Sequence, residues 1–159
     1  MLISNDLSNM HVLCLDPERE WLNILSVELK AVGLRQIMTT TDPKKALEFL
    51  QLGNIDLVLI NHNPKFVRLL RRSKSSPNPR IPVIVLTHQI SWVDIFTIRD
   101  AGANEIVIKP CSVKQIISRI KTVAAHPREF VTADQFIGPD RRRSDILLSG
   151  PNRRKGKLR

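Results

Sequence analysis

The segment Asp56-Leu57-Val58-Leu59-Ile60-Asn61 is the strongest indication of the fold class of this 159-residue chain. Its apolar side chains follow one another without the polar alternation that a strand with one solvated face shows. Such a short, continuous apolar run is typical of a parallel strand that other elements cover on both faces. We therefore expect a buried strand over residues 56–60, with Asn61 at its carboxyl end.

Apolar strands and amphipathic helices alternate through the rest of residues 11–125. Asp16-Pro17 and Asp42-Pro43 each predict a helix start, with the acid as N-cap and the proline in the first turn. Gly33 and Gly102 predict the ends of two helices. The expected strands are 11–15, 35–40, 56–60, 82–86 and 106–108, and the expected helices are 17–32, a helix from residue 43, 64–72, 90–101 and 112–125.

Five strands that alternate with five helices predict an α/β fold built on a doubly wound parallel sheet. Right-handed crossovers leave few strand orders, and we expect the flavodoxin-like order 2-1-3-4-5 with a C-terminal extension. In such sheets the ligand site lies at the carboxyl ends of the strands. Here those ends carry Asp16, Asn61, Thr87 and Lys109.

Five segments in the expected order resemble the receiver domain of two-component signalling, the CheY-like family. They are Asp16 after the first strand, the strand before Asn61, the segment 82–87 that ends in Thr87, Ala101-Gly102-Ala103, and Ile108-Lys109-Pro110. The resemblance covers about residues 11–125, which leaves an N-terminal segment 1–10 and a basic extension 126–159. It implies a response regulator role in bacterial phosphorelay signal transduction.

The sequence departs from that family where the chemistry takes place. In a working receiver two acids after the first strand and an acceptor aspartate hold Mg²⁺, while the lysine and the hydroxyl contact the phosphoryl group. Pro17 stands in place of one acid, Asn61 in place of the acceptor, and Ile106 in place of the switch aromatic. A neutral amide is a poor nucleophile and a weak magnesium ligand. We expect a pseudo-receiver: no enzyme, no cofactor and no bound metal.

Thr87 and Lys109 then have two interpretations. As inherited scaffold, Lys109 pairs with Asp16 or bonds the Asn61 carbonyl and so holds the loops in one state. As a retained anion pocket, the two side chains sense a phosphate-bearing ligand. We take the first as the working interpretation; a receiver phosphorylated by an atypical route is a further alternative.

In receivers the face of the fourth helix, fifth strand and fifth helix commonly mediates pairing. Here that face would include Asp94, Arg99, Ile106, Lys114 and Arg119. The resemblance implies a histidine kinase, a phosphotransferase or another receiver as partner, with a homodimer as a further option. For Trp92, at the start of this helix, core packing is the simple interpretation; exposure would mark a partner surface instead.

The formal net charge of +10 favours acidic partners, and the alternative function is nucleic-acid binding. In helix 64–72 we expect Phe66, Leu69 and Leu70 to face the core. Its basic stripe, continued into the next loop, would then contact phosphates; the stripe consists of Lys65, Arg68, Arg71, Arg72 and Lys74. The basic tail would do the same through Arg141, Arg142, Arg143, Arg153, Arg154 and Lys155.

The extension also carries apolar residues that fit a strip lying back over the domain, or over a second copy. These are Phe130, Val131, Phe136 and Ile137. The segment Gly138-Pro139-Asp140-Arg141-Arg142-Arg143 resembles the tail of small receiver-like proteins, and residues 144–159 are expected to be disordered.

Composition bounds the setting of the protein. No run approaches the ~20 apolar residues that span a bilayer, and the N-terminus lacks a signal-peptide pattern. Cys14 and Cys111 are the only cysteines, and their spacing suggests neither zinc nor a disulfide framework. We expect a reduced, cytoplasmic protein. For Cys111, a pKa lowered by Lys109 is one option, and an ordinary small loop residue is the preferred interpretation.

Overall fold

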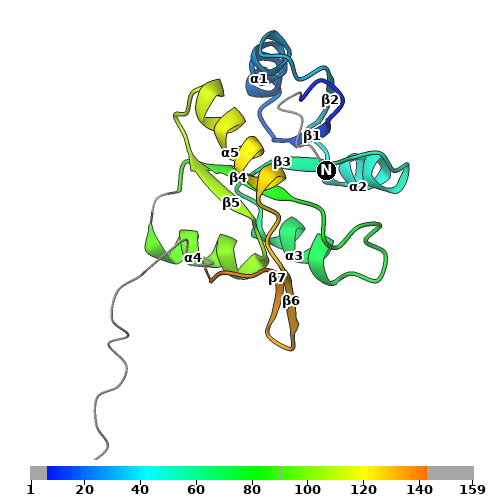
Figure 1. Ribbon diagram of the computed structural model, residues 1–159, viewed down its shortest axis with the longest axis vertical. Coiled ribbons are helices and arrows are strands. Elements are labelled where there is room, and N and C mark those ends of the chain that lie inside the picture. Colours follow the sequence, from blue (N-terminus) through cyan, green and yellow to red (C-terminus); the bar gives the residue numbers. More distant parts are fainter. Residues whose placement is uncertain (1–6, 90, 143–159) are drawn as a thin grey trace, which may run out of the picture.

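The computed structural model describes residues 7–89 and 91–142. Of the expected basic tail, Arg143, Arg153, Arg154 and Lys155 lie outside the described residues, as does the segment 144–159. Figure 1 shows a central sheet with helices around it and a small hairpin at one end. The elements are β1 (His11–Leu15), α1 (Arg19–Ala31), β2 (Gln36–Thr40), α2 (Pro43–Gln51), β3 (Leu57–Asn61), α3 (Pro64–Arg72), β4 (Val83–Thr87), α4 (Trp92–Ala101), β5 (Glu105–Ile108), α5 (Val113–Ala125), β6 (Phe130–Ala133) and β7 (Phe136–Pro139).

The five-stranded sheet has the order β2-β1-β3-β4-β5, as expected from the sequence. Every neighbouring pair in it is parallel. β3 lies in the middle, where Val58 is in register with Leu13 of β1 and Val83 of β4. The last residue of β3 is Asn61 and that of β4 is Thr87, so both side chains stand at the carboxyl edge of the sheet.

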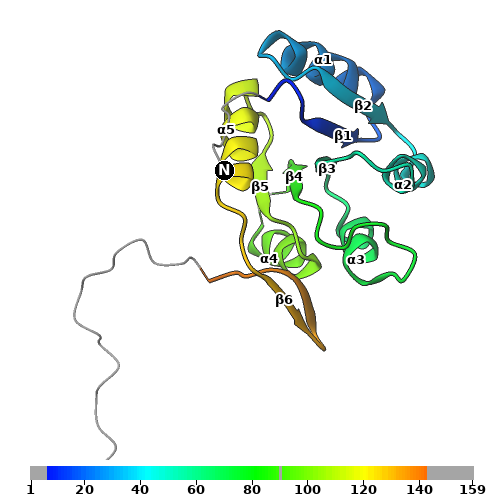
Figure 2. The ribbon, with the colours of Figure 1, turned by 45° about the vertical axis from the view of Figure 1, so that its right-hand side comes forward.

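Helices cover both faces of the sheet, which explains the unbroken apolar run of β3 (Figures 1 and 2). Val58 and Ile60 pack into a core with α2, α3 and α4. Leu57 and Leu59 point the other way, into a core with α1 and α5. The strand is therefore buried on both faces, as its sequence predicts.

Local signals set most of the helix starts. The Asp42 side chain caps α2 by accepting a hydrogen bond from the Lys44 N–H at 2.8 Å. At α1 the expectation is wrong, because Glu18 is the N-cap and the helix begins at Arg19. Asp16 Oδ1 instead accepts a hydrogen bond from the Glu18 N–H at 2.9 Å, in a tight turn before the helix. The Asp16 carboxylate is thereby held at the strand edge.

The inward face of α3 differs from the expected one. Phe66 and Leu70 are buried, but Leu69 is 37% exposed and Arg71 is only 3% exposed. Charged residues are rarely buried unless they are paired, so the sequence pattern placed Arg71 on the solvated face. The basic stripe therefore loses its central residue to the protein interior.

Residues after α5 form an antiparallel hairpin of β6 and β7. It packs back against α3 and α4 of its own domain, which is the first of the two arrangements expected for the apolar strip. Phe130 lies under the Arg71 guanidinium, with 5.2 Å from Cζ to the ring centroid. Figure 2 shows the hairpin beside α4, away from α1 and α2.

In the described part of the chain, no helix combines the length and apolarity needed to cross a membrane.

Candidate functional site

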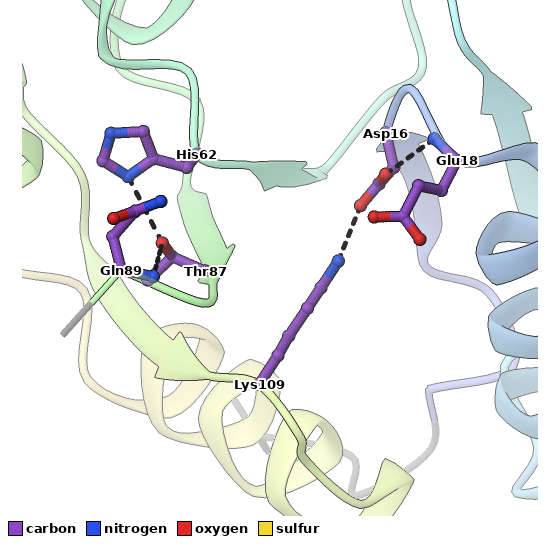
Figure 3. A network of polar contacts seen from close by, with 6 residues as sticks. All are labelled: Asp16, Glu18, His62, Thr87, Gln89 and Lys109. Atoms are coloured by element: carbon purple, nitrogen blue, oxygen red, sulfur yellow. Dashed lines mark hydrogen bonds and ion pairs between the residues drawn. The ribbon is translucent and has the colours of Figure 1, made fainter.

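A buried ion pair occupies the carboxyl edge of the sheet. Lys109 Nζ lies 2.9 Å from Asp16 Oδ2, and the two side chains are 6% and 4% exposed. Of the two partners that the sequence leaves open for Lys109, the structure places Asp16 against it (Figure 3). Because the second Asp16 oxygen is bound by the Glu18 N–H, both oxygens of this carboxylate are in use.

Thr87 belongs to a second network in the same region. Its hydroxyl accepts a hydrogen bond from the Gln89 N–H at 2.9 Å and lies 3.2 Å from His62 Nδ1, where the histidine tautomer sets the direction of the bond. In Figure 3 this network stands apart from the Asp16–Lys109 pair. The hydroxyl and the lysine thus have separate partners.

Trp21 fills the space beside Lys109. Its ring centroid lies 4.6 Å from Lys109 Nζ, which is a cation–π distance. The hollow that Asp16, Trp21 and Asn61 help to line has a cavity volume of about 0 Å³. Among the described residues, Trp21 Nε1 is the one buried side-chain nitrogen or oxygen without a hydrogen-bond partner. Trp21 has helical spacing in the chain, but this spacing does not indicate the contact with Lys109.

These residues do not fit the magnesium ion of a working receiver. Mg²⁺ prefers several oxygen ligands, of which carboxylates bind most strongly. Asp16 is the acid at the end of β1, its oxygens face Lys109 and the Glu18 N–H, and Pro17 and Asn61 add no charge. Within residues 7–89 and 91–142, no three His, Cys, Asp or Glu side chains gather as a metal site would require.

Neither cysteine is activated by this site. Burial raises the pKa of Cys14 to about 12. Burial also raises the pKa of Cys111, and this effect outweighs the lowering influence of Lys109. Of the two interpretations of Cys111, the ordinary loop residue is therefore favoured, because desolvation of the thiolate is the larger cause.

The residues expected on the interaction face lie on α4, β5 and α5. Arg99, Lys114 and Arg119 are exposed, whereas Asp94 and Ile106 are half-buried. Asp94 bonds the hydroxyl of the N-cap Ser91. Arg119 lies 3.7 Å from Glu105, so an ion pair links α5 to β5.

Apolar side chains also stand out of α4 and β5 on this side of the molecule. Trp92 is 78% exposed, Val93 75%, Phe96 50% and Ile108 46%. The core-packing interpretation of Trp92 is therefore wrong, because the helix turns it to solvent. Exposed aromatic side chains of this kind often mark binding surfaces.

Comparisons with known proteins agree with this architecture. The chain is 28% identical over 119 residues to a probable transcriptional regulator ycf27 of Cyanophora paradoxa, covering 74% of this chain and 49% of that protein. It is 26% identical over 117 residues to the transcriptional regulatory protein PhoP of Escherichia coli, covering 72% and 52%. The chain thus spans about half the length of the curated relatives it matches.

Solved structures share the fold. The Vibrio cholerae chemotaxis protein CheY4 is similar with a TM-score of 0.64 and 21% identity, over 72% of this chain and 98% of that one. A response regulator from Thermotoga maritima gives a TM-score of 0.63 and 20% identity, over 74% and 99%. The family model of the response regulator receiver domain matches residues 12–121. The chain therefore belongs to the response regulator receiver domain family.

Proposed function

We propose that this protein is a receiver that accepts no phosphoryl group and acts in bacterial signal transduction through contacts with other proteins. The observation that carries the proposal is the Asp16–Lys109 ion pair beside Asn61. The lysine that neutralises phosphoryl oxygens in a working receiver is here paired within the protein. The acceptor position offers an amide, which is a far poorer nucleophile than a carboxylate.

The test is phosphorylation by a small donor. We expect intact-mass spectrometry to find no phosphoryl adduct on the wild-type chain after incubation with acetyl phosphate and Mg²⁺. Asn61→Asp alone should restore little labelling, because Pro17 leaves the metal with too few charged ligands. The double variant Pro17→Asp/Asn61→Asp supplies both carboxylates and should label clearly.

Two results would count against this account. An adduct on the wild-type chain would refute the loss of phosphotransfer. Full labelling of Asn61→Asp alone would refute the part assigned to Pro17. Circular dichroism of each variant checks that it keeps the fold.

The partners that receiver membership suggests are a histidine kinase, a phosphotransferase or another receiver. The exposed residues of α4 and β5, Trp92, Phe96 and Ile108 among them, support a protein-binding surface. Capture experiments with residues 1–142 as bait should recover such a protein. Loss of that capture in Trp92→Ala would place the contact on α4.

Nucleic-acid binding is the other candidate from the sequence. Burial of Arg71 removes the centre of the α3 stripe, and Arg141 is held by Asp100 at 2.7 Å. The names of the two relatives describe transcriptional regulation, but the match reaches about half of each. We therefore rank this function second; steeply salt-dependent binding of duplex DNA would support it.

A further inference from the structure

A cavity of about 280 Å³ lies where the C-terminal hairpin meets the receiver body. Residues of the receiver body and residues of the C-terminal extension both line this cavity. Its lining is Arg99 from α4, Ala103, Asn104, Glu105 and Ile106 around the start of β5, and Arg128, Pro139 and Arg141 from the extension. The cavity therefore depends on the docking of the extension.

Close backbone contacts fix the wall that the hairpin provides. A Cβ atom on Gly102 would stand 2.6 Å from the Ile137 carbonyl oxygen, and one on Gly138 would stand 2.8 Å from Gly102 Cα. Such distances leave room for glycine alone. The two glycines let the hairpin approach the end of α4, so that Pro139 and Arg141 reach the cavity.

The lining carries an excess of positive charge. Three arginines and one glutamate line the cavity. Glu105 already faces Arg128 at 3.0 Å and Arg119 at 3.7 Å, while Arg141 is paired with Asp100 outside the lining. In the described part of the chain, no carboxylate lies within ion-pair distance of Arg99, whose recorded contact is the Phe96 ring at 5.7 Å. Of the three lining arginines, Arg99 is therefore the one left to pair with an incoming carboxylate.

An aromatic stripe on α4 leads into this cavity. Trp92, Phe96 and Arg99 are spaced four and three residues apart, which puts them on one face of the helix. The Trp92 and Phe96 ring centroids are 6.3 Å apart, and Arg99 lies over the Phe96 ring. At 1.5 Å per residue the stripe runs about 10 Å from its apolar end to its charged end.

The charge of this surface decides between two kinds of protein partner. In a two-fold symmetric homodimer the same patch forms both sides of the interface, so two arginine-rich surfaces of like charge would be brought together. A segment with carboxylates and apolar anchors complements both ends of the surface. The formal net charge of +10 also repels a second copy and attracts an acidic partner.

We propose that the arginine cavity and the α4 stripe together bind an acidic segment of a partner protein. A carboxylate of that segment enters the cavity beside Arg99, and an apolar side chain of the segment packs on Trp92 and Phe96. This inference rests on the proposed function and specifies the chemistry of the partner. The part of the surface made by Arg128, Pro139 and Arg141 comes from the extension.

The test is selection from a phage-displayed library of random peptides with the full chain as bait. Recovered sequences are made as fluorescein-labelled peptides, and their dissociation constants are measured by fluorescence anisotropy. We expect enrichment of Asp and Glu together with large apolar residues. Arg99→Gln should weaken binding about tenfold, since a hydrogen bond to a charged group is lost. Trp92→Ala should weaken it to a similar extent.

The control is Arg35→Gln, which removes the same charge from an exposed site before β2 and should leave the affinity unchanged. Three results would overturn the proposal. They are peptides without acidic enrichment, acidic peptides that bind Arg99→Gln as well as wild type, and single-stranded oligonucleotides that bind more tightly than the peptides through Arg99.

This test is separate from the phosphorylation test. If acidic peptides are not selected while the chain stays unlabelled by acetyl phosphate and captures a signalling protein, the cavity proposal fails and the proposed function stands. If the chain is labelled, the proposed function fails whatever the peptides do.

Discussion

Asn61 and the Asp16–Lys109 pair both bear on the proposal that the receiver site accepts no phosphoryl group. In the proposed function the Asn61 amide supplies no nucleophile, and the ion pair engages Asp16 and Lys109 with each other. A buried charge without a partner is costly, so each member of the pair requires the other. The Trp21 ring beside Lys109 adds a cation–π contact.

The ion pair is tested by a double-mutant cycle. Lys109→Met should lower the free energy of unfolding by about 3–5 kcal/mol, because the Asp16 carboxylate stays buried without its cation. Asp16→Asn/Lys109→Met should recover much of this loss, so the coupling free energy should exceed about 1 kcal/mol. Urea unfolding followed by circular dichroism measures each corner of the cycle. Additive effects of the two single changes would contradict the pairing.

At the scale of elements, Arg71 joins the end of α3 to three neighbouring segments. Its guanidinium donates hydrogen bonds to the carbonyls of Gly102, Pro79 and Ile81 and to the Asn104 side chain. Burial lowers its pKa to about 10, which still leaves it charged at neutral pH. With Phe130 stacked on its plane, Arg71 also supports the hairpin.

A matched pair of substitutions tests this role. Arg71→Met should lower the free energy of unfolding by about 3 kcal/mol or more, because several buried acceptors lose their donor. Arg72→Met is the control, because Arg72 is exposed and makes one long hydrogen bond, 3.3 Å to the Asp134 carbonyl. We expect the control to change stability by less than about 0.5 kcal/mol. Equal effects in urea unfolding would show that the buried contacts of Arg71 contribute little.

At the scale of the whole molecule, the hairpin closes the end of the domain opposite the carboxyl edge of the sheet. Its ion pairs reach β5 and α4, from Arg128 to Glu105 and from Arg141 to Asp100. Gly138 packs directly on Gly102. The extension is thus part of the folded body up to at least Arg141.

Two truncated chains test how far the hairpin stabilises the fold. Residues 1–127 should melt about 5 °C or more below residues 1–142, because the shorter chain loses the packing of Phe130 and Gly138 and both ion pairs. Both chains lack residues 143–159, so the comparison isolates the hairpin. Thermal melts by circular dichroism provide the measurement. Equal melting temperatures would show that the hairpin rests on the body without stabilising it.

The loss of the acceptor at Asn61 remains a prediction, whereas the strand order and most element positions were predictable from the amino-acid sequence alone. These follow from local signals: an apolar run such as Leu57–Ile60, a cap such as Asp42, and a glycine such as Gly102 at a helix end. Element bounds differ by one or two residues, because neighbouring strands extend β3 to Asn61 and β4 to Thr87. The boundaries 11–125 and 126–159 remain predictions.

Which polar residues are buried depends on contacts between segments that are distant in the sequence. Lys109 and Asp16 are 93 residues apart, and Arg71 reaches Gly102 across 31 residues. A charged residue at helical spacing has the same local pattern whether it meets solvent or buried carbonyls. The partners that make burial favourable come from other segments, so local periodicity carries no information about them. The arginine cavity likewise depends on how closely Gly138 approaches Gly102.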